Sequence, residues 1–117
     1  MVVFDYENRG IWLAGIFDSG RVSLVDRMNG NYRYFNIKMS GKKKFIEDMR
    51  EMIGFGNIYN SSNIEPDNRQ LFITSRRDIL KFIDMIDGKV IFRKQVLEEF
   101  KKNVEESMRK KNNNDEV

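Results

Sequence analysis

The side chains that could do chemistry in this chain form a restricted set. Its 117 residues include no cysteine and no histidine, whereas aspartate and glutamate together number 18 and lysine and arginine 21. This composition excludes disulfides, zinc sites of the usual kind, and cysteine or histidine nucleophiles. Any metal chemistry would be that of a hard cation held by carboxylate oxygens.

Asp18 is the acid in the most distinctive setting. It ends the apolar, small-residue segment WLAGIFD at residues 12–18, and Ser19 and Gly20 follow before the chain begins to alternate polar and apolar residues. An aspartate at a helix end usually caps or pairs with nearby groups, so we expect a structural role for Asp18. No metal site and no cofactor is predicted.

Charge and hydropathy limit the class of protein. The net charge is +3 and the pI about 9.2, which is compatible with a polyanionic partner but is weak evidence for one. The apolar segments are all shorter than the roughly 20 residues of a membrane span, and no leader segment is recognised. We expect a soluble, unprocessed protein of the cytoplasm, without a membrane partner.

Periodicity predicts eight elements in the order α-β-β-α-β-β-α-α. The helices are expected at residues 9–19, 42–53, 76–86 and 91–110, and the strands from residue 21, at 32–39, within 56–61 and within 69–75. Residues 28–31, which include Asn-Gly, are expected to form the first hairpin turn. Residues 1–110 are then one domain, and residues 111–117 a flexible tail.

Cap residues and apolar stripes support these helices. Asn8, or alternatively Asp5, is expected to cap the first helix, Gly54 to end the second and Ser75 to cap the third. The side chains expected to face inward from the last two helices are Ile79, Leu80, Ile83 and Ile86, and Val96, Leu97, Phe100 and Val104.

This order, opened by LAGIFDSG at residues 13–20, resembles the LAGLIDADG homing endonuclease family. Leu13, Ala14, Gly15 and Asp18 match the motif letter for letter. The segments GRVSL, MIGFGNIY, LFITSRRDILKFIDMI and FRKQVLEEF fall where the family places its first strand, second hairpin, fourth strand and later helices. The resemblance implies an α+β fold, αββαββα with a concave four-stranded antiparallel sheet, here with an extra C-terminal helix.

The resemblance also implies a homodimer. In the family two such helices pack side by side at a twofold axis, and a single motif in this chain requires a second copy. The predicted interface residues are Leu13, Ala14, Gly15, Phe17 and Asp18. The alternative is a monomer in which the first helix is merely part of the core.

One acid of the motif is missing. In the family the eighth motif position is an Asp or Glu that holds divalent ions, but here Gly20 follows Ser19. Either Gly20 replaces the acid, or the acid is deleted and Gly20 is the final motif glycine; we favour the deletion, because it puts Val22 and Leu24 on the core face. Two supporting family positions fall near Met39 and Phe92. We therefore expect no catalytic residues and a relative that is not an enzyme.

The family's sheet lies along the major groove of DNA, so the side chains opposite the core face are candidate DNA contacts. They are Arg21, Ser23, Arg27, Tyr32, Tyr34, Asn36, Lys38, Asn57, Tyr59, Ser61, Gln70 and Phe72. Arg suits guanine, Asn and Gln suit adenine, and aromatic rings suit thymine methyl groups. The alternative is an ordinary solvated sheet face. The run GKKK at residues 41–44 is a candidate phosphate contact.

These observations predict a homodimeric, sequence-specific protein that binds a pseudo-palindromic site in double-stranded DNA and acts as a transcriptional regulator or repressor. Two other functions stay open: an active or nicking Mg²⁺-dependent homing endonuclease, and an RNA-binding splicing helper of the maturase kind.

Overall fold

The computed structural model of the chain describes residues 8–60 and 66–115. The elements are α1 (Arg9–Asp18), β1 (Val22–Asn29), β2 (Tyr32–Lys42), α2 (Lys43–Ile53), β3 (Asn57–Asn60), β4 (Asn68–Ile73), α3 (Arg76–Ile86) and α4 (Lys94–Asp115). The predicted α+β class and order of elements are confirmed. Over these described ranges, no helix combines the length and the apolar character needed to cross a membrane.

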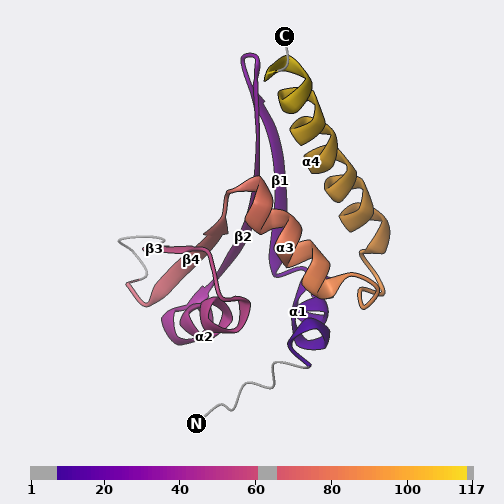
Figure 1. Ribbon diagram of the computed structural model, residues 1–117. Helices are drawn as coiled ribbons and strands as arrows, with labels where there is room; N and C mark the ends of the chain where they lie inside the picture. Colours follow the sequence, from indigo (N-terminus) through magenta and orange to yellow (C-terminus); the bar gives the residue numbers. More distant parts are fainter. Residues whose placement is uncertain (1–7, 61–65, 116–117) are drawn as a thin grey trace.

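The strands form one antiparallel sheet in the order β1-β2-β4-β3 (Figure 1). Asn29 pairs with Tyr32, so the β1–β2 turn consists of Gly30 and Asn31 and lies one residue later than predicted. Gly30 has φ 64°, and no other described residue of this turn has a positive φ. Glycine alone at the first central position is typical of a type II′ turn, which matches the twist of the flanking strands.

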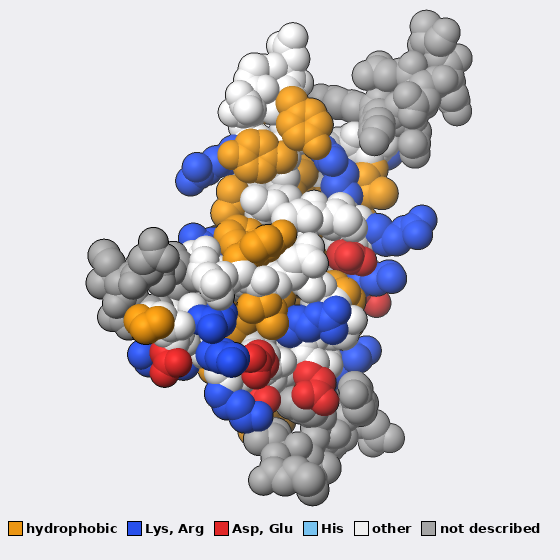
Figure 2. All heavy atoms as spheres, turned by 90° about the vertical axis from the view of Figure 1, so that its left-hand side faces the viewer, with side chains coloured by type: hydrophobic (Ala, Val, Ile, Leu, Met, Phe, Trp, Pro, Cys, Tyr) orange, Lys and Arg blue, Asp and Glu red, His pale blue; other side chains and the backbone are white. Residues whose placement is uncertain are grey.

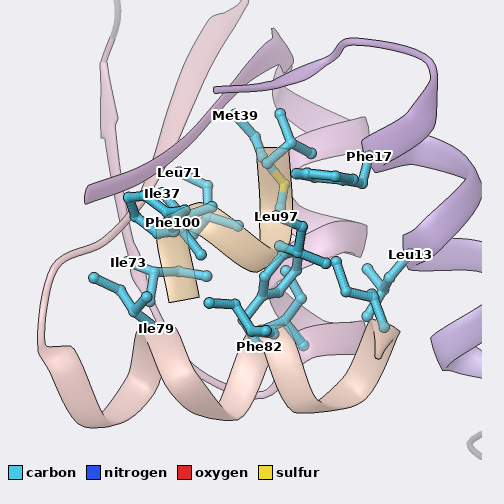
Figure 3. Packing of buried hydrophobic residues seen from close by; sticks show 14 of the residues in the cluster. Leu13, Phe17, Ile37, Met39, Leu71, Ile73, Ile79, Phe82, Leu97 and Phe100 are labelled. Atoms are coloured by element: carbon cyan, nitrogen blue, oxygen red, sulfur yellow. The ribbon is translucent and has the colours of Figure 1, made fainter. Parts of the chain in front are cut away.

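The hydrophobic core lies on one face of this sheet. Val22 pairs with Met39, and Met39 with Leu71, so their side chains share that face, and all three are buried. Figure 3 shows strand residues packed against helix residues: Ile37, Met39, Leu71 and Ile73 from the sheet, Leu13 and Phe17 from α1, Ile79 and Phe82 from α3, and Leu97 and Phe100 from α4. The helices therefore cover a single face.

The predicted ends of α2 and α3 are confirmed. Gly54 ends α2 in the left-handed conformation, with φ 93°, and its N–H donates to the Arg50 carbonyl at 2.8 Å. Ser75 caps α3, since its hydroxyl accepts the Asp78 N–H at 3.1 Å. Asn8 occupies the N-cap position of α1, although its side chain makes no capping bond there.

Two predictions about the last two helices are wrong in detail. Leu80 is only partly buried, and Phe82 takes the core position instead, because the stripe Ile79, Phe82, Ile83 and Ile86 follows the helical period more closely. Val96 is 50% exposed, beside the buried stripe of α4. α4 runs on through residues 111–115. No glycine or proline interrupts the helix there.

Asp18 ties the end of α1 to the segment before α4. Its Oδ2 accepts the Ile91 N–H at 2.7 Å, and its Oδ1 accepts the N–H groups of Phe92 and Arg93 at 3.1 and 3.0 Å. Successive backbone N–H groups of this kind form a small site for an anion. Asp18 is therefore structural, but its partners are distant in the sequence.

Arg93 completes the connection from the other side. Its guanidinium donates to the carbonyls of Phe17 and Val22 at 2.9 and 2.8 Å and lies 4.2 Å from the centroid of the Phe17 ring. We call these contacts the Asp18–Arg93 clamp. The clamp joins α1, the first residue of β1 and the start of α4.

Partial burial raises the pKa of the Asp18 carboxyl, but the three backbone donors and the charge of Arg93 together lower it more. The net result is a pKa below the ordinary value of 3.8. A carboxyl whose pKa is lower in the folded state contributes stability above its unfolded pKa and loses it as the pH falls through the folded pKa.

We expect Asp18→Asn to lower the free energy of unfolding by about 2 kcal/mol at pH 7, because the variant cannot form the charge-assisted hydrogen bonds. The difference from wild type should shrink as the pH falls from 3.8, where the unfolded carboxyl becomes protonated, through the lower pKa of the folded carboxyl. Urea unfolding across this pH range measures both quantities. Asp84→Asn, on the exposed face of α3, is the control and should show neither effect. A difference that does not change with pH would contradict the role of the charge.

Candidate nucleic-acid interface

Within residues 8–60 and 66–115, no helix covers the face of the sheet opposite the core, and we call this face the open face. Strand pairing defines its members, because directly paired residues project to the same side. They are Ser23, Val25, Arg27, Asn29, Tyr32, Tyr34, Asn36, Lys38, Ser40, Lys42, Asn57, Tyr59, Asn68, Gln70 and Phe72. Pairs such as Ser23 with Lys38 and Tyr59 with Gln70 hold them in transverse rows.

The structure brings ten of the candidate DNA contacts together on this face: Ser23, Arg27, Tyr32, Tyr34, Asn36, Lys38, Asn57, Tyr59, Gln70 and Phe72. Arg21 is not among them. It precedes β1, and its guanidinium lies 5.6 Å from the centroid of the Phe45 ring of α2, a ring that packs against the core. Ser61 lies outside the described residues. Continuing the alternation to the ends of the strands would also have identified Asn29, Ser40, Lys42 and Asn68.

The open face carries no acidic side chain. The four strands contain a single acid, Asp26, which pairs with Phe35 and so projects to the covered side. The side of the molecule opposite α4 shows hydrophobic and basic side chains mixed over its upper and middle parts, with acidic ones toward its lower part and one edge (Figure 2). A polyanion approaching the open face therefore meets Arg27 and Lys38 without a carboxylate beside them in the strands.

Asp26 belongs to a polar network that holds the β1–β2 hairpin against α4. Arg33 donates to both carboxylate oxygens of Asp26, at 2.8 and 2.6 Å, and Asn103 of α4 donates to one of them at 3.3 Å. The Arg33 guanidinium lowers the pKa of Asp26 below its ordinary value of 3.8, outweighing the effect of partial burial. Arg76 adds bonds to the Ser107 hydroxyl at 2.7 Å and the Arg33 carbonyl at 2.8 Å. The periodicity of the sequence does not indicate this network.

Lysines gather where β2 passes into α2. Lys42, Lys43 and Lys44 line a shallow pocket with Glu47 and Asp67. Lys44 lies 3.0 Å from the Asp48 carboxylate, and Lys43 lies 4.0 Å from Glu47. Exposed pairs of this kind contribute little stability, so the lysines can exchange these partners for a phosphate at small cost.

The predicted dimer interface on α1 needs correction. Leu13, Ala14 and Phe17 are 1%, 1% and 0% exposed, because they fill the core of their own chain. Asp18 is engaged in the clamp. Gly15 alone keeps the expected position: it is exposed, and a Cβ added to it would meet nothing within 4 Å.

Asp18, at the end of α1, is not arranged to hold a divalent ion, because both oxygens of its carboxylate already accept backbone hydrogen bonds. Gly20 has φ 87°, a conformation that favours glycine, where the helix turns toward β1. Met39 is buried on the core face, whereas Phe92 is 83% exposed. Val22 also lies on the core face, the arrangement on which the deletion alignment depends.

No family model and no curated protein matches this sequence. Among solved structures, the LAGLIDADG homing endonuclease I-GzeII in complex with its DNA target aligns with a TM-score of 0.76 and 18% identity, over 95% of this chain and 39% of its own. The homing endonuclease I-TnaI aligns with a TM-score of 0.72 and 16% identity, over 92% and 76%. The homing endonuclease I-CvuI in complex with its target aligns with a TM-score of 0.69 and 8% identity, over 86% and 69%.

These comparisons contradict the expectation that the chain is not an enzyme, since the solved structures that share its fold are homing endonucleases. That expectation depended mainly on one position, Gly20, whereas the likeness to the homing endonuclease structures extends over the whole arrangement of helices and strands. The chain has the fold of the LAGLIDADG homing endonucleases.

Proposed function

We propose that the chain is a sequence-specific, double-stranded DNA-binding protein of the homing endonuclease class, and that the open face of its sheet reads the major groove. The observation that carries this proposal is the open face itself, an uncovered and acid-free surface that combines amides, cations and aromatic rings. These are the groups that match base edges in the major groove. I-GzeII and I-CvuI, which share the fold, were solved in complex with DNA and with its target respectively, and this supports DNA as the partner.

The size of the sheet suits this role. β2 runs from Tyr32 to Lys42, which at about 3.3 Å per residue spans roughly 33 Å. One turn of B-DNA is about 34 Å long. A single subunit would therefore follow about one turn of the groove, the length of one half-site.

We infer a homodimer formed through the exposed side of α1. Ile11 and Trp12 are 59% and 64% exposed, and Gly15 follows on the same side of the helix. Large apolar side chains left exposed together indicate a protein contact. Gly15 allows a second backbone to approach closely. A twofold axis there would set two open faces along one duplex, so that the site is pseudo-palindromic.

Binding and cleavage are separable parts of the proposal. A protein that occupies its site excludes others from it, so the regulatory role predicted from the sequence requires binding alone. Cleavage is the activity to which the fold class points.

Sedimentation should show a dimer for the wild type and a weaker dimer for Gly15→Leu, because the added side chain overpacks the helix contact by about 1–3 kcal/mol. That cost raises the dimer dissociation constant roughly fivefold to more than a hundredfold. Lys102→Leu adds the same side chain to an exposed position of α4 and should leave the dimer unchanged. A wild type that is monomeric at high protein concentration would contradict the proposed homodimer.

Selection from a random duplex library should enrich a palindromic consensus. Arg27→Ala should then alter base preference at symmetric positions, by about 1–3 kcal/mol for each bidentate hydrogen-bonded pair that it removes. Lys43→Ala should weaken binding to all sequences alike and reduce the salt slope by about one unit for each phosphate that is no longer neutralised. If both variants change base preference and affinity in the same way, the open face does not determine which DNA sequence is bound.

The enzymatic part is tested on a supercoiled plasmid that carries the selected site. We expect breakage that needs Mg²⁺ or Mn²⁺ and occurs at the site, measured as nicked or linear product. A plasmid with the site scrambled is the control and should remain supercoiled. Tight, specific binding without any metal-dependent product would remove the cleavage proposal and leave the binding one standing.

A further inference from the structure

Two aromatic rings meet on the open face, one on the central strand β4 and one on the edge strand β3. Phe72 of β4 pairs with Lys38 on one side and with Asn57 on the other, and Tyr59 of β3 lies one row away opposite Gln70. The rings of Tyr59 and Phe72 have centroids 5.6 Å apart and an interplanar angle of 71°, an edge-to-face contact. We call Phe72 and Tyr59 the aromatic pair.

The aromatic pair is held in a defined orientation. The edge-to-face contact restrains both rings, and the Lys38 Nζ lies 5.9 Å from the centroid of Phe72. Phe72 is half-buried and Tyr59 is 53% exposed, so both rings retain surface that faces away from the protein. Fixed rings lose little rotational freedom when a ligand covers them.

The polar groups around the pair are weighted toward adenine. The amides of the open face are Asn29, Asn36, Asn57, Asn68 and Gln70, and its cations are Arg27, Lys38 and Lys42. Asn and Gln bond adenine in a bidentate manner, whereas Arg and Lys bond guanine. The carboxylates that would accept a hydrogen bond from cytosine do not occur on this face of the described strands.

A phenylalanine ring discriminates among base edges because it forms no ordinary hydrogen bond. When the ring covers a hydrogen-bond donor or acceptor of a base, that group loses its water and gains no partner, which is unfavourable. The C5-methyl group of thymine is the apolar group that the major groove presents. Covering that methyl group removes apolar surface from water and is favourable.

We propose that the aromatic pair binds thymine methyl groups, so that the part of each half-site that lies against β3 and β4 is rich in A·T pairs. This inference rests on the proposed binding of duplex DNA and goes beyond it by naming the base chemistry that is read. Phe72 makes the principal contact, and the neighbouring amides Asn57 and Gln70 take the adenines of the same or adjacent pairs.

The test compares two forms of the duplex selected from the random library, one made with dT and the other with dU throughout. Deoxyuridine keeps every hydrogen-bonding group of thymidine and lacks only the methyl group. We expect the wild type to bind the dU duplex about fourfold more weakly for each methyl group in contact, equivalent to about 0.8 kcal/mol.

Two variants locate the contact. Phe72→Ala should bring the ratio of the dU and dT dissociation constants close to one. Because the ratio is taken within one protein preparation, it does not depend on the fraction that is folded. Phe92→Ala removes another exposed phenylalanine, 83% exposed and outside the strands, and should keep the wild-type ratio.

The outcomes separate this inference from the proposal beneath it. Enrichment of an A·T-rich duplex with a ratio that depends on Phe72 supports the aromatic pair as the methyl reader. Equal binding of the dT and dU duplexes by the wild type overturns the inference and leaves DNA binding intact. A ratio that survives Phe72→Ala also overturns it. A library from which no duplex is enriched overturns the proposed function itself.

Discussion

The register of β2 is the constraint on which the rest of the structure depends. β2 pairs with β1 on one side and β4 on the other, so two ladders fix its alternation. A slip by one residue would expose Phe35, Ile37 and Met39 to water and bury Lys38 and its neighbours under the helices. Burial of one set of side chains therefore determines where the other set lies. The open face follows from the packing of the core and needs no further device to organise it.

Contacts on the covered side hold the sheet and helices in place. The Phe35 ring lies edge-on to Phe100 of α4, with centroids 5.8 Å apart, and the guanidinium groups of Arg33 and Arg76 lie 5.1 and 5.4 Å from its centroid. The Asp18–Arg93 clamp has the same effect at the other end of β1. Neither group belongs to the open face, yet both help to set the angle of the strands that carry it.

The sequence predicted the fold and the open face well, because both depend on periodicity. A period of two separates the faces of β2, and caps such as Gly54 and Ser75 set the helix ends. α1 could not be oriented in the same way, since it is apolar on every side: Trp12 is exposed and Leu13 is buried, and hydropathy does not distinguish them. The partners of Asp18 were also beyond prediction, because backbone N–H groups of distant residues leave no pattern in the sequence.

The positions of the charged side chains are more informative about a partner than the net charge is. A net charge of +3 is a poor argument for a polyanionic partner. The arrangement is a better one, since Asp26, the acid within the strands, lies on the covered side with Arg33 against its carboxylate. Its negative charge is thereby compensated away from the open face, where Arg27 and Lys38 remain.

The strands also differ in rigidity: β2 and β4 are paired on both sides, whereas β1 and β3 are edges. Groups on the central strands start closest to their bound positions and lose least freedom on binding, so sequence discrimination should be concentrated there.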